Sequence, residues 1–338
     1  MANPSTDDPN GAPTVNTLLA DNAGPVTAAT PVTPERPIAA KGSLRTVLGM
    51  LWRDKFATAA VIFLLLMILC AIFGPALLGE AATKQNLRGR NLAPFTLDHG
   101  WLMFLGADAL GRPLLARIVV AAQNTLMIAA GAVALSASIG AGLGLVAGYG
   151  PKWAGTAIMR LADVIMSFPS LLLAVIVLYM LHPSVGNVIL VLAITRIPIY
   201  LRTTRAEVLE IKERMFVQAA QVMGASSLRI VFRHILPMVI PTLVTIATLD
   251  FAFVMLAESA LSFLGIGIQP PAITWGLMVA QGKQYLANAW WLAFWPGLAI
   301  ILTTLSLNLL SSWLRIALDP AQRWRLEISP TSKTAGGK

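Results

Sequence analysis

Charged residues are scarce in this chain. They make up 12% of its 338 residues, whereas soluble domains average about 25%. Five long stretches carry no charge at all, and they cover residues 56–79, 118–151, 164–195, 259–282 and 284–314. Because a membrane-spanning helix needs about 20 mostly apolar residues, the composition predicts an all-α polytopic membrane protein and excludes an ordinary soluble domain.

Several kinds of reactive group are also missing. Cys70 is the only cysteine and lies in the first apolar stretch, so no disulfide can form within the chain and we expect an inert packing role. No G-x-x-x-x-G-K-[ST] phosphate loop is present, so the chain cannot hold ATP in that manner. The three histidines, His99, His182 and His234, are scattered. With no metal-ligand cluster, catalytic carboxylate pair or nucleophile motif, the sequence predicts no enzyme, cofactor or metal.

The positive charge is distributed as in a membrane protein. A formal charge of +9 could indicate nucleic acid, but the basic residues lie between the apolar stretches. With six spans and both termini in the cytoplasm, 19 of the 25 basic residues are cytoplasmic or within spans. The external ones are then Lys84, Arg88, Arg90, Arg112, Arg117 and Lys283. This distribution follows the positive-inside rule and predicts a membrane rather than a nucleic-acid partner.

We expect six transmembrane helices. Their approximate ranges are 56–78, 118–147, 158–181, 187–204, 238–264 and 293–314. The loop that begins at residue 269 holds Trp275, Trp290 and Trp291, which would suit an aromatic belt at the membrane surface.

The chain divides by composition into four parts. Residues 1–40 carry no secretory signal pattern and are rich in Pro, Ala, Thr and Asn, which predicts a disordered cytoplasmic tail. Residues 41–116 would form the first transmembrane helix and an external loop. Residues 117–320 would form a five-helix core with a cytoplasmic loop at 205–237, and residues 321–338 a second cytoplasmic tail.

Small residues recur at helical spacing in the second expected span. Gly140, Gly144 and Gly148 form a ridge that lets another helix approach closely. The partner could be a helix of this chain or of another subunit.

Ionisable residues inside spans are costly and often functional. Arg160 and Asp163 have the spacing of a local ion pair on one helix face. Arg196 could extend to the membrane surface or pair with a neighbouring helix. Asp250 and Glu258 lie about two turns apart on the fifth expected span, so both could line a water-filled translocation path or make hydrogen bonds between helices.

The loop before the fifth span has the form of a docking element. Residues 213–223 predict a short helix, in which Ala219 and Ala220 present a surface of small residues. Gly224 suits the left-handed residue that ends a helix. Ser226 or Ser227 would cap a second short helix over residues 228–235, before Pro237 begins the span.

This loop resembles the E-A-A-x3-G-x9-I-x-L-P segment of ABC importer permeases. The positions that match its spacing are Gln218, Ala219, Ala220, Gly224, Leu236 and Pro237. Gln218 replaces the usual acid, and His234 stands where the general pattern has Ile. The sequence Arg-His-Ile-Leu-Pro at 233–237 is characteristic of the C-type subunit of the dipeptide/oligopeptide branch.

Other segments resemble that branch over about residues 42–320. They are Leu-Gly-Ala-Asp-Ala-Leu-Gly-Arg at 105–112, Met159-Arg160 with Asp163 and Phe168-Pro169, the 261–276 stretch with Pro270-Pro271 and Trp275-Gly276, and Leu-Asp-Pro at 318–320. The chain departs from the branch's usual residues at Pro113, at Gln123 and at 311–313.

The resemblance implies a type I ABC importer permease fold in a bacterial cytoplasmic (inner) membrane. It also implies a heteromeric complex for peptide transport, with a second permease subunit of the B type, two ATPase subunits or domains that bind the ATP, and an extracytoplasmic solute-binding protein. The 216–237 loop would couple the chain to the ATPases. The same branch serves nickel, opines and oligosaccharides, so the cargo stays open. A different class, an ATP-independent channel or secondary carrier, would transport solute without partners.

Overall fold

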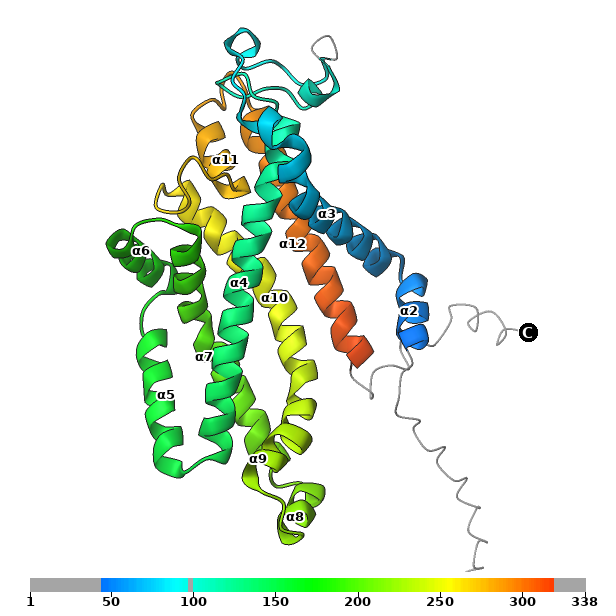
Figure 1. Ribbon diagram of the computed structural model, residues 1–338, viewed down its shortest axis with the longest axis vertical. Coiled ribbons are helices and arrows are strands. Elements are labelled where there is room, and N and C mark those ends of the chain that lie inside the picture. The colour runs from blue at the N-terminus through cyan, green and yellow to red at the C-terminus, as the bar shows by residue number, and fades with distance from the viewer. Residues whose placement is uncertain (1–43, 97–99, 319–338) are drawn as a thin grey trace, which may run out of the picture. The chain divides into compact units, whose positions relative to one another are not determined.

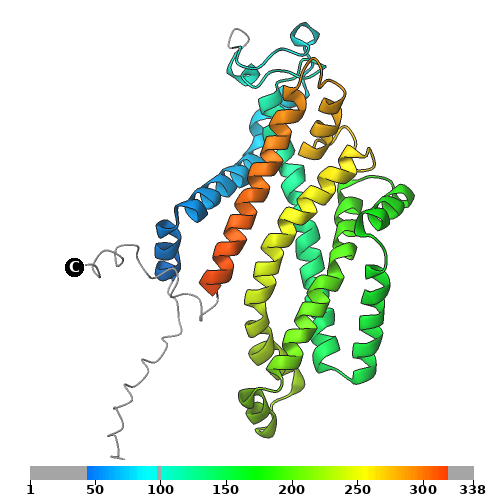
Figure 2. The same cartoon turned by 180° about the vertical axis from the view of Figure 1, so that it is seen from behind.

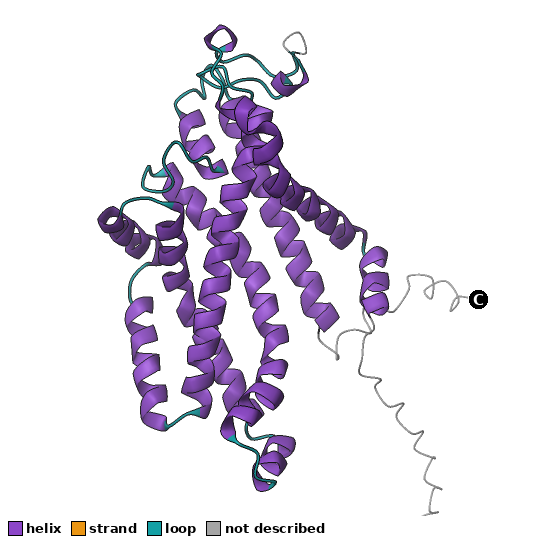
Figure 3. Ribbon diagram, in the orientation of Figure 1, coloured by secondary structure: helices purple, strands orange, loops and turns teal. Residues whose placement is uncertain are grey.

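The computed structural model describes residues 44–96 and 100–318, and within these ranges the regular elements are all helical (Figure 3). The α-helices are α2 (Leu44–Arg53), α3 (Lys55–Thr83), α4 (Leu114–Tyr149), α5 (Lys152–Met166), α6 (Ser170–Leu181), α7 (Val185–Ile211), α8 (Met215–Val222), α9 (Ser227–Ile230), α10 (Leu236–Phe263), α11 (Trp275–Lys283) and α12 (Trp291–Leu318). Short 3₁₀ helices cover Leu87–Gly89 and Trp101–Met103, and a π-helix covers Val231–Ile235. The two tails expected at 1–40 and 321–338 lie outside the described residues, and the four-part division of the chain stays a prediction.

Five helical segments are long and apolar enough to cross a membrane. They are α3, α4, α7, α12 and the continuous stretch Ser227–Phe263 that contains α9 and α10. A sixth crossing is possible only if α5 and α6 together count as one span. Five of the six expected spans are therefore confirmed in approximate position, and the count of six is reached only when α5 and α6 form one broken span.

The third expected span, 158–181, is not one straight helix. It is broken between Met166 and Ser170, and the axes of α5 and α6 differ by 87°. Pro169 explains the break, because proline lacks the N–H that would continue the helix and disfavours helical geometry at Phe168 before it. The prediction of an uninterrupted third span was wrong.

The helices place two loop regions at opposite ends of the bundle. The loop between α3 and α4 and helix α11 lie at one end, and α8 and α9 lie at the other (Figures 1 and 2). We call the first the external end and the second the cytoplasmic end, as the charge distribution predicts.

The glycine ridge of α4 packs inside this chain, against α7. A Cβ atom added to Gly140 would lie 2.6 Å from Tyr200 Cβ, one on Gly144 would lie 2.5 Å from Thr204 Cβ, and one on Gly148 would lie 2.7 Å from Val208 Cβ. These distances are shorter than any ordinary contact between carbon atoms. Of the two partners left open by the sequence, the structure therefore selects a helix of the same subunit.

Two tryptophans expected in an aromatic belt are instead part of the core. Trp275 is 0% exposed and Trp291 is 7% exposed, whereas Trp290 is 47% exposed. The Trp275 backbone N–H donates to Thr125 Oγ1 at 3.1 Å and its indole Nε1 donates to the Ile118 carbonyl at 2.9 Å. Trp275 therefore fixes the start of α11 against α4, and only Trp290 keeps the exposure of a belt residue.

The charge pair expected within α5 is formed with a different helix. Asp163 pairs with Arg202 of α7 rather than with Arg160. Both side chains of this pair are more than 40% exposed, so the pair adds little to stability. The pair joins the last turn of α5 to the second half of α7, so these parts of the two helices lie side by side.

Because α4 and α7 are in such close contact, replacing a glycine of α4 with alanine should affect stability very differently at two positions. Gly144→Ala should lower the stability of the protein by about 1–3 kcal/mol, because the added methyl group overlaps α7. Gly142→Ala is the matched control, because a Cβ there meets nothing within 4 Å and alanine favours the helix by about 0.5–1 kcal/mol. Thermal unfolding in mild detergent measures both, and equal melting temperatures for the two variants would contradict the packing.

Candidate functional site

The loop from residue 212 to 237 projects at the cytoplasmic end and is anchored by its inner face. Val217 and Ala220 of α8 are 0% and 3% exposed. They belong to an apolar cluster with Leu145 of α4 and Val208 and Ile211 of α7. The Gln221 Nε2 also donates to the Tyr149 hydroxyl at 3.4 Å. Helix α8 is therefore packed directly on the ends of two spans.

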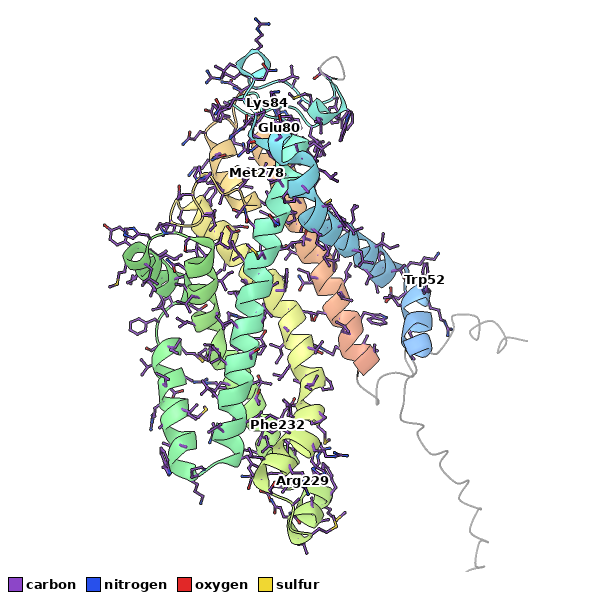
Figure 4. The ribbon with its side chains drawn as sticks, in the orientation of Figure 1. Trp52, Glu80, Lys84, Arg229, Phe232 and Met278 are labelled. Carbon is purple, nitrogen blue, oxygen red and sulfur yellow. The ribbon has the colours of Figure 1, made fainter. Side chains whose placement is uncertain are left out.

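The outer face of the same loop is apolar and uncovered. Five large apolar side chains are at least 59% exposed, and they are Met215, Val222, Met223, Leu228 and Phe232. Figure 4 shows Phe232 and Arg229 at this end of the protein. Exposed apolar patches mark protein or membrane contact sites. We call these five residues the outer apolar surface.

The backbone of the loop follows the expected pattern in part. Gly224 adopts φ +81° and a Cβ there meets nothing within 4 Å, so glycine is needed for its conformation and not for space. Ser226 Oγ accepts from the Arg229 N–H at 3.4 Å, which confirms the expected cap of α9.

The second short helix expected over 228–235 is not a separate element. Helix α9 passes through the π-helix at 231–235 directly into α10. Pro237 accounts for the π-turn, because it has no N–H to donate to the carbonyl four residues earlier, and the Leu236 N–H donates to the Val231 carbonyl instead. The 212–237 loop is therefore continuous with α10, the fifth expected span.

The predicted coupling residues differ in exposure. Gln218, Ala219, Gly224 and Pro237 are exposed, whereas Ala220 is buried and Leu236 is half-buried. The Gln218 side-chain amide donates to the Glu213 carbonyl at 3.2 Å. An ionised glutamate at this position could not donate that hydrogen bond, so Gln218 closes the turn before α8 in a way that the usual acid cannot.

The two acids of α10 are both buried inside this chain. Asp250 is 3% exposed and is paired with Arg196 of α7, whose guanidinium carbon lies 4.1 Å from the centre of the Phe253 ring. Glu258 is 0% exposed and accepts from Ser262 Oγ at 2.7 Å. Arg196 thus pairs with a neighbouring helix, as one of the two expectations for it proposed. In this conformation neither acid is open to a water-filled path.

Asp108 organises the external end, in a way that the sequence did not reveal. Its Oδ1 accepts from the backbone N–H groups of Leu110 and Arg112, both at 2.9 Å. Its Oδ2 accepts from Arg112 Nε at 2.7 Å and from Arg117 Nη1. The carboxylate therefore closes the 108–112 turn and ties it to the first turn of α4. Arg117, nine residues along the chain, carries no local signal for this contact.

Gly111 in the same turn must be glycine because its backbone passes very close to the backbone of Asn86. It adopts φ +72°, and a Cβ there would lie 1.7 Å from the Asn86 carbonyl oxygen. The Asn86 N–H donates to the Leu110 carbonyl at 3.1 Å. The turn thus holds the end of α3 beside the start of α4, which gives a physical reason for the glycine in the 105–112 segment.

Sequence comparison places most of the chain in one group of proteins. Residues 140–324 match the family described as binding-protein-dependent transport system inner membrane component, and residues 44–94 match the N-terminal TM domain of oligopeptide transport permease C. The di/tripeptide transport system permease protein DppC of Pseudomonas aeruginosa is 40% identical over 79% of this chain and 88% of its own length. The dipeptide permease DppC of Alkalihalophilus pseudofirmus is 35% identical over 86% and 94%. The glutathione permease GsiD of Escherichia coli is 37% identical over 84% and 94%.

The hydrogen bonds and ion pairs of Asp108 predict that its replacement lowers stability by an amount that depends on pH. Burial alone would raise the pKa of Asp108, but hydrogen bonds from Arg112 and the charges of Arg117 and Arg112 hold this pKa below its usual value. Asp108→Asn should cost about 3–5 kcal/mol, because it leaves the buried Arg117 and the half-buried Arg112 without their anion. Glu80→Gln, an exposed change at the same end (Figure 4), is the control.

The sign of the pH effect follows from the lowered pKa. The stabilisation is complete above the unfolded pKa of about 3.9 and is lost as the pH falls through the lower folded pKa. The difference in melting temperature between wild type and D108N should therefore stay constant from about pH 7 to 5 and narrow below about pH 4. A difference that grows at acid pH would contradict this.

Proposed function

The chain belongs to the family of binding-protein-dependent transport system inner membrane components, and from this premise we propose that its 212–237 loop transmits ATPase movement to the spans. The chain is a multi-pass inner membrane permease subunit of an ABC importer for peptides and is not itself the ATPase. Its family implies a binding protein and ABC partners. The proposals below concern which residues couple, which subunits assemble and what is carried.

The single observation that supports coupling is that one face of the loop is packed against the spans while the other face is exposed. Inside, Val217 and Ala220 are buried against the ends of α4 and α7, and α9 continues into α10. Outside, the outer apolar surface has no cover within the described part of the chain. A partner that binds the outside would therefore move α7, α10 and the inner cluster together. Rigid-body movement of packed elements is a common way to switch between two states.

The partner of the outer apolar surface is proposed to be an ATPase subunit or domain. Ala219 and Gly224 are exposed on this loop and small, so they would leave room for a partner's groove to close over the apolar side chains. We assign two ATPases to the complex, and a second permease subunit of the B type, as the resemblance of the loop and the other boxes implies. Purification of the tagged chain from its own membrane, with mass spectrometry of what is retained, tests this composition.

The cargo is proposed to be a dipeptide or short oligopeptide. The support is the cargo printed in the names of the relatives, which are di/tripeptide, dipeptide and glutathione permeases. Uptake of labelled dipeptides by the reconstituted complex tests it. Transport by the chain alone, in liposomes without ATP, would instead indicate an independent channel or carrier.

Gly224 gives the sharpest test of coupling. Gly224→Asp should reduce ATP-driven uptake by more than about tenfold while ATP hydrolysis and membrane insertion persist, because docking would bury an unpaired carboxylate beside Val222 and Met223. Gly224→Asn is the matched control, because asparagine has nearly the same shape and also tolerates a positive φ. Uptake by G224D equal to that of G224N would contradict the docking.

A role for Asp250 and Glu258 in the translocation path stays a prediction. Because Asp250 is paired with Arg196, a test of this role must change both residues. Asp250 could reach cargo only when the pair opens. Asp250→Asn should lower stability by about 3 kcal/mol, because it leaves the half-buried Arg196 without its anion. The double change Arg196→Gln with Asp250→Asn should recover most of that loss.

Cargo preference separates the two roles of Asp250. If this acid holds the ammonium end of a peptide, the double variant should discriminate less between peptides with a free and an acetylated N-terminus. An unchanged preference, measured by competition for uptake, would remove Asp250 from the path and leave it as a contact between α7 and α10.

A further inference from the structure

A cavity of about 560 Å³ lies at the external end of the protein. Its wall comes from residues 108–117, from the turn after α10 and from α11 with the residues that follow it. Figure 4 labels Met278, a wall residue of α11, at the same end as Lys84. Cavities of about 300–1,000 Å³ are typical of small-molecule sites. The cytoplasmic coupling loop is at the opposite end, so this cavity is separate from the coupling site.

Positive charge exceeds negative charge in the cavity wall. The charged wall residues are three cations, Arg112, Arg117 and Lys283, and one acid, Asp108. Both oxygens of Asp108 already accept hydrogen bonds from backbone and guanidinium groups. Both arginines pair with this one carboxylate, so three cations share a single acid in the wall. Arg112 is only partly buried and Lys283 is exposed, so this excess positive charge would attract an anion into the cavity.

Arg117 is the buried cation of the wall, and one of its nitrogens has no hydrogen-bond partner. It is 4% exposed, its Nη1 donates to Asp108, and its Nη2 donates to Gln281 Oε1 at 3.3 Å. Its Nε has no hydrogen-bond partner. Lys283 stands at the rim, exposed, with its Nζ 4.6 Å from the centre of the Phe263 ring. The cations thus extend from the floor of the cavity to its edge.

The rest of the wall is largely apolar. Leu110, Phe263, Met278 and Leu292 line it beside the charged groups. An apolar wall with a few convergent charged donors suits an organic anion better than an inorganic one. A carboxylate accepts up to two parallel hydrogen bonds from a guanidinium group, while an attached side chain would cover the apolar part.

We infer that this cavity receives the terminal carboxylate of a short peptide on the external side of the membrane. Arg112 and Arg117 supply the charge that holds the carboxylate, and Lys283 attracts it at the rim. The inference rests on the proposed peptide cargo, and it adds a specificity site to a permease whose coupling residues lie at the other end.

Direct binding tests this site in the assembled complex. The chain, purified with its partner permease and ATPases in lipid nanodiscs and without binding protein, is titrated with the dipeptide Ala-Phe and with its C-terminal amide. Wild type should bind the free acid more tightly. Arg112→Gln should weaken binding of the acid about tenfold, as expected for loss of a charged hydrogen bond, and should leave binding of the amide unchanged.

Two further variants keep the test decisive if R112Q does not fold. Lys283→Gln, at an exposed rim position, should weaken binding of the acid about threefold. Lys84→Gln removes an exposed external lysine outside the cavity wall and should change nothing. Equal binding of acid and amide by wild type, together with normal dipeptide uptake, would overturn the carboxylate site and leave the proposed function intact.

Two other results have distinct meanings. If the wild-type complex with its binding protein takes up no dipeptide in the presence of ATP, the proposed function itself fails. If R112Q and K283Q weaken docking of the binding protein but keep the wild-type preference for the free acid, the inference is overturned and the cavity serves as a docking surface.

Discussion

The contact between α4 and α7 determines where the 212–237 loop lies. Gly140, Gly144 and Gly148 let the two helices approach until their backbones almost touch, and larger residues would force them apart. The ridge leads directly into the apolar cluster in which Leu145 and Val208 meet Val217 of α8. The same close approach that stabilises the bundle therefore also positions the apolar cluster against which α8 packs.

The two ends of the bundle are built by different physical means. At the cytoplasmic end, apolar packing fixes the inner face of α8 and leaves the outer apolar surface free for a partner. At the external end, the Asp108 carboxylate and its two arginines hold the 108–112 turn to α4. Between them, the Arg196–Asp250 pair connects α7 to α10. The two helices that flank the 212–237 loop are therefore also joined to each other farther along the bundle.

Local patterns in the sequence predicted much of this. Uncharged stretches predicted the spans, glycine spacing predicted the α4 ridge, and the left-handed glycine and the Ser226 cap were predicted within the loop. Two of the failed predictions depended on contacts between distant residues. Trp275 was expected at the membrane surface but finds Thr125 and Ile118 inside the bundle. Asp163 has a nearby arginine in sequence, yet pairs with Arg202 from another helix. The break at Pro169 could have been predicted, because proline disfavours a continuous helix.

The central claim is that the outer apolar surface contacts an ATPase, and site-specific photo-crosslinking tests it most directly. A photo-reactive amino acid at Val222, which is 89% exposed on the coupling loop, is compared with one at Tyr179, which is 82% exposed on α6. Irradiation of intact membranes followed by mass spectrometry identifies what each position touches. The account predicts an ATPase peptide joined to position 222 and none joined to position 179. Crosslinks from position 222 to lipid alone, in membranes that still import peptide, would contradict it.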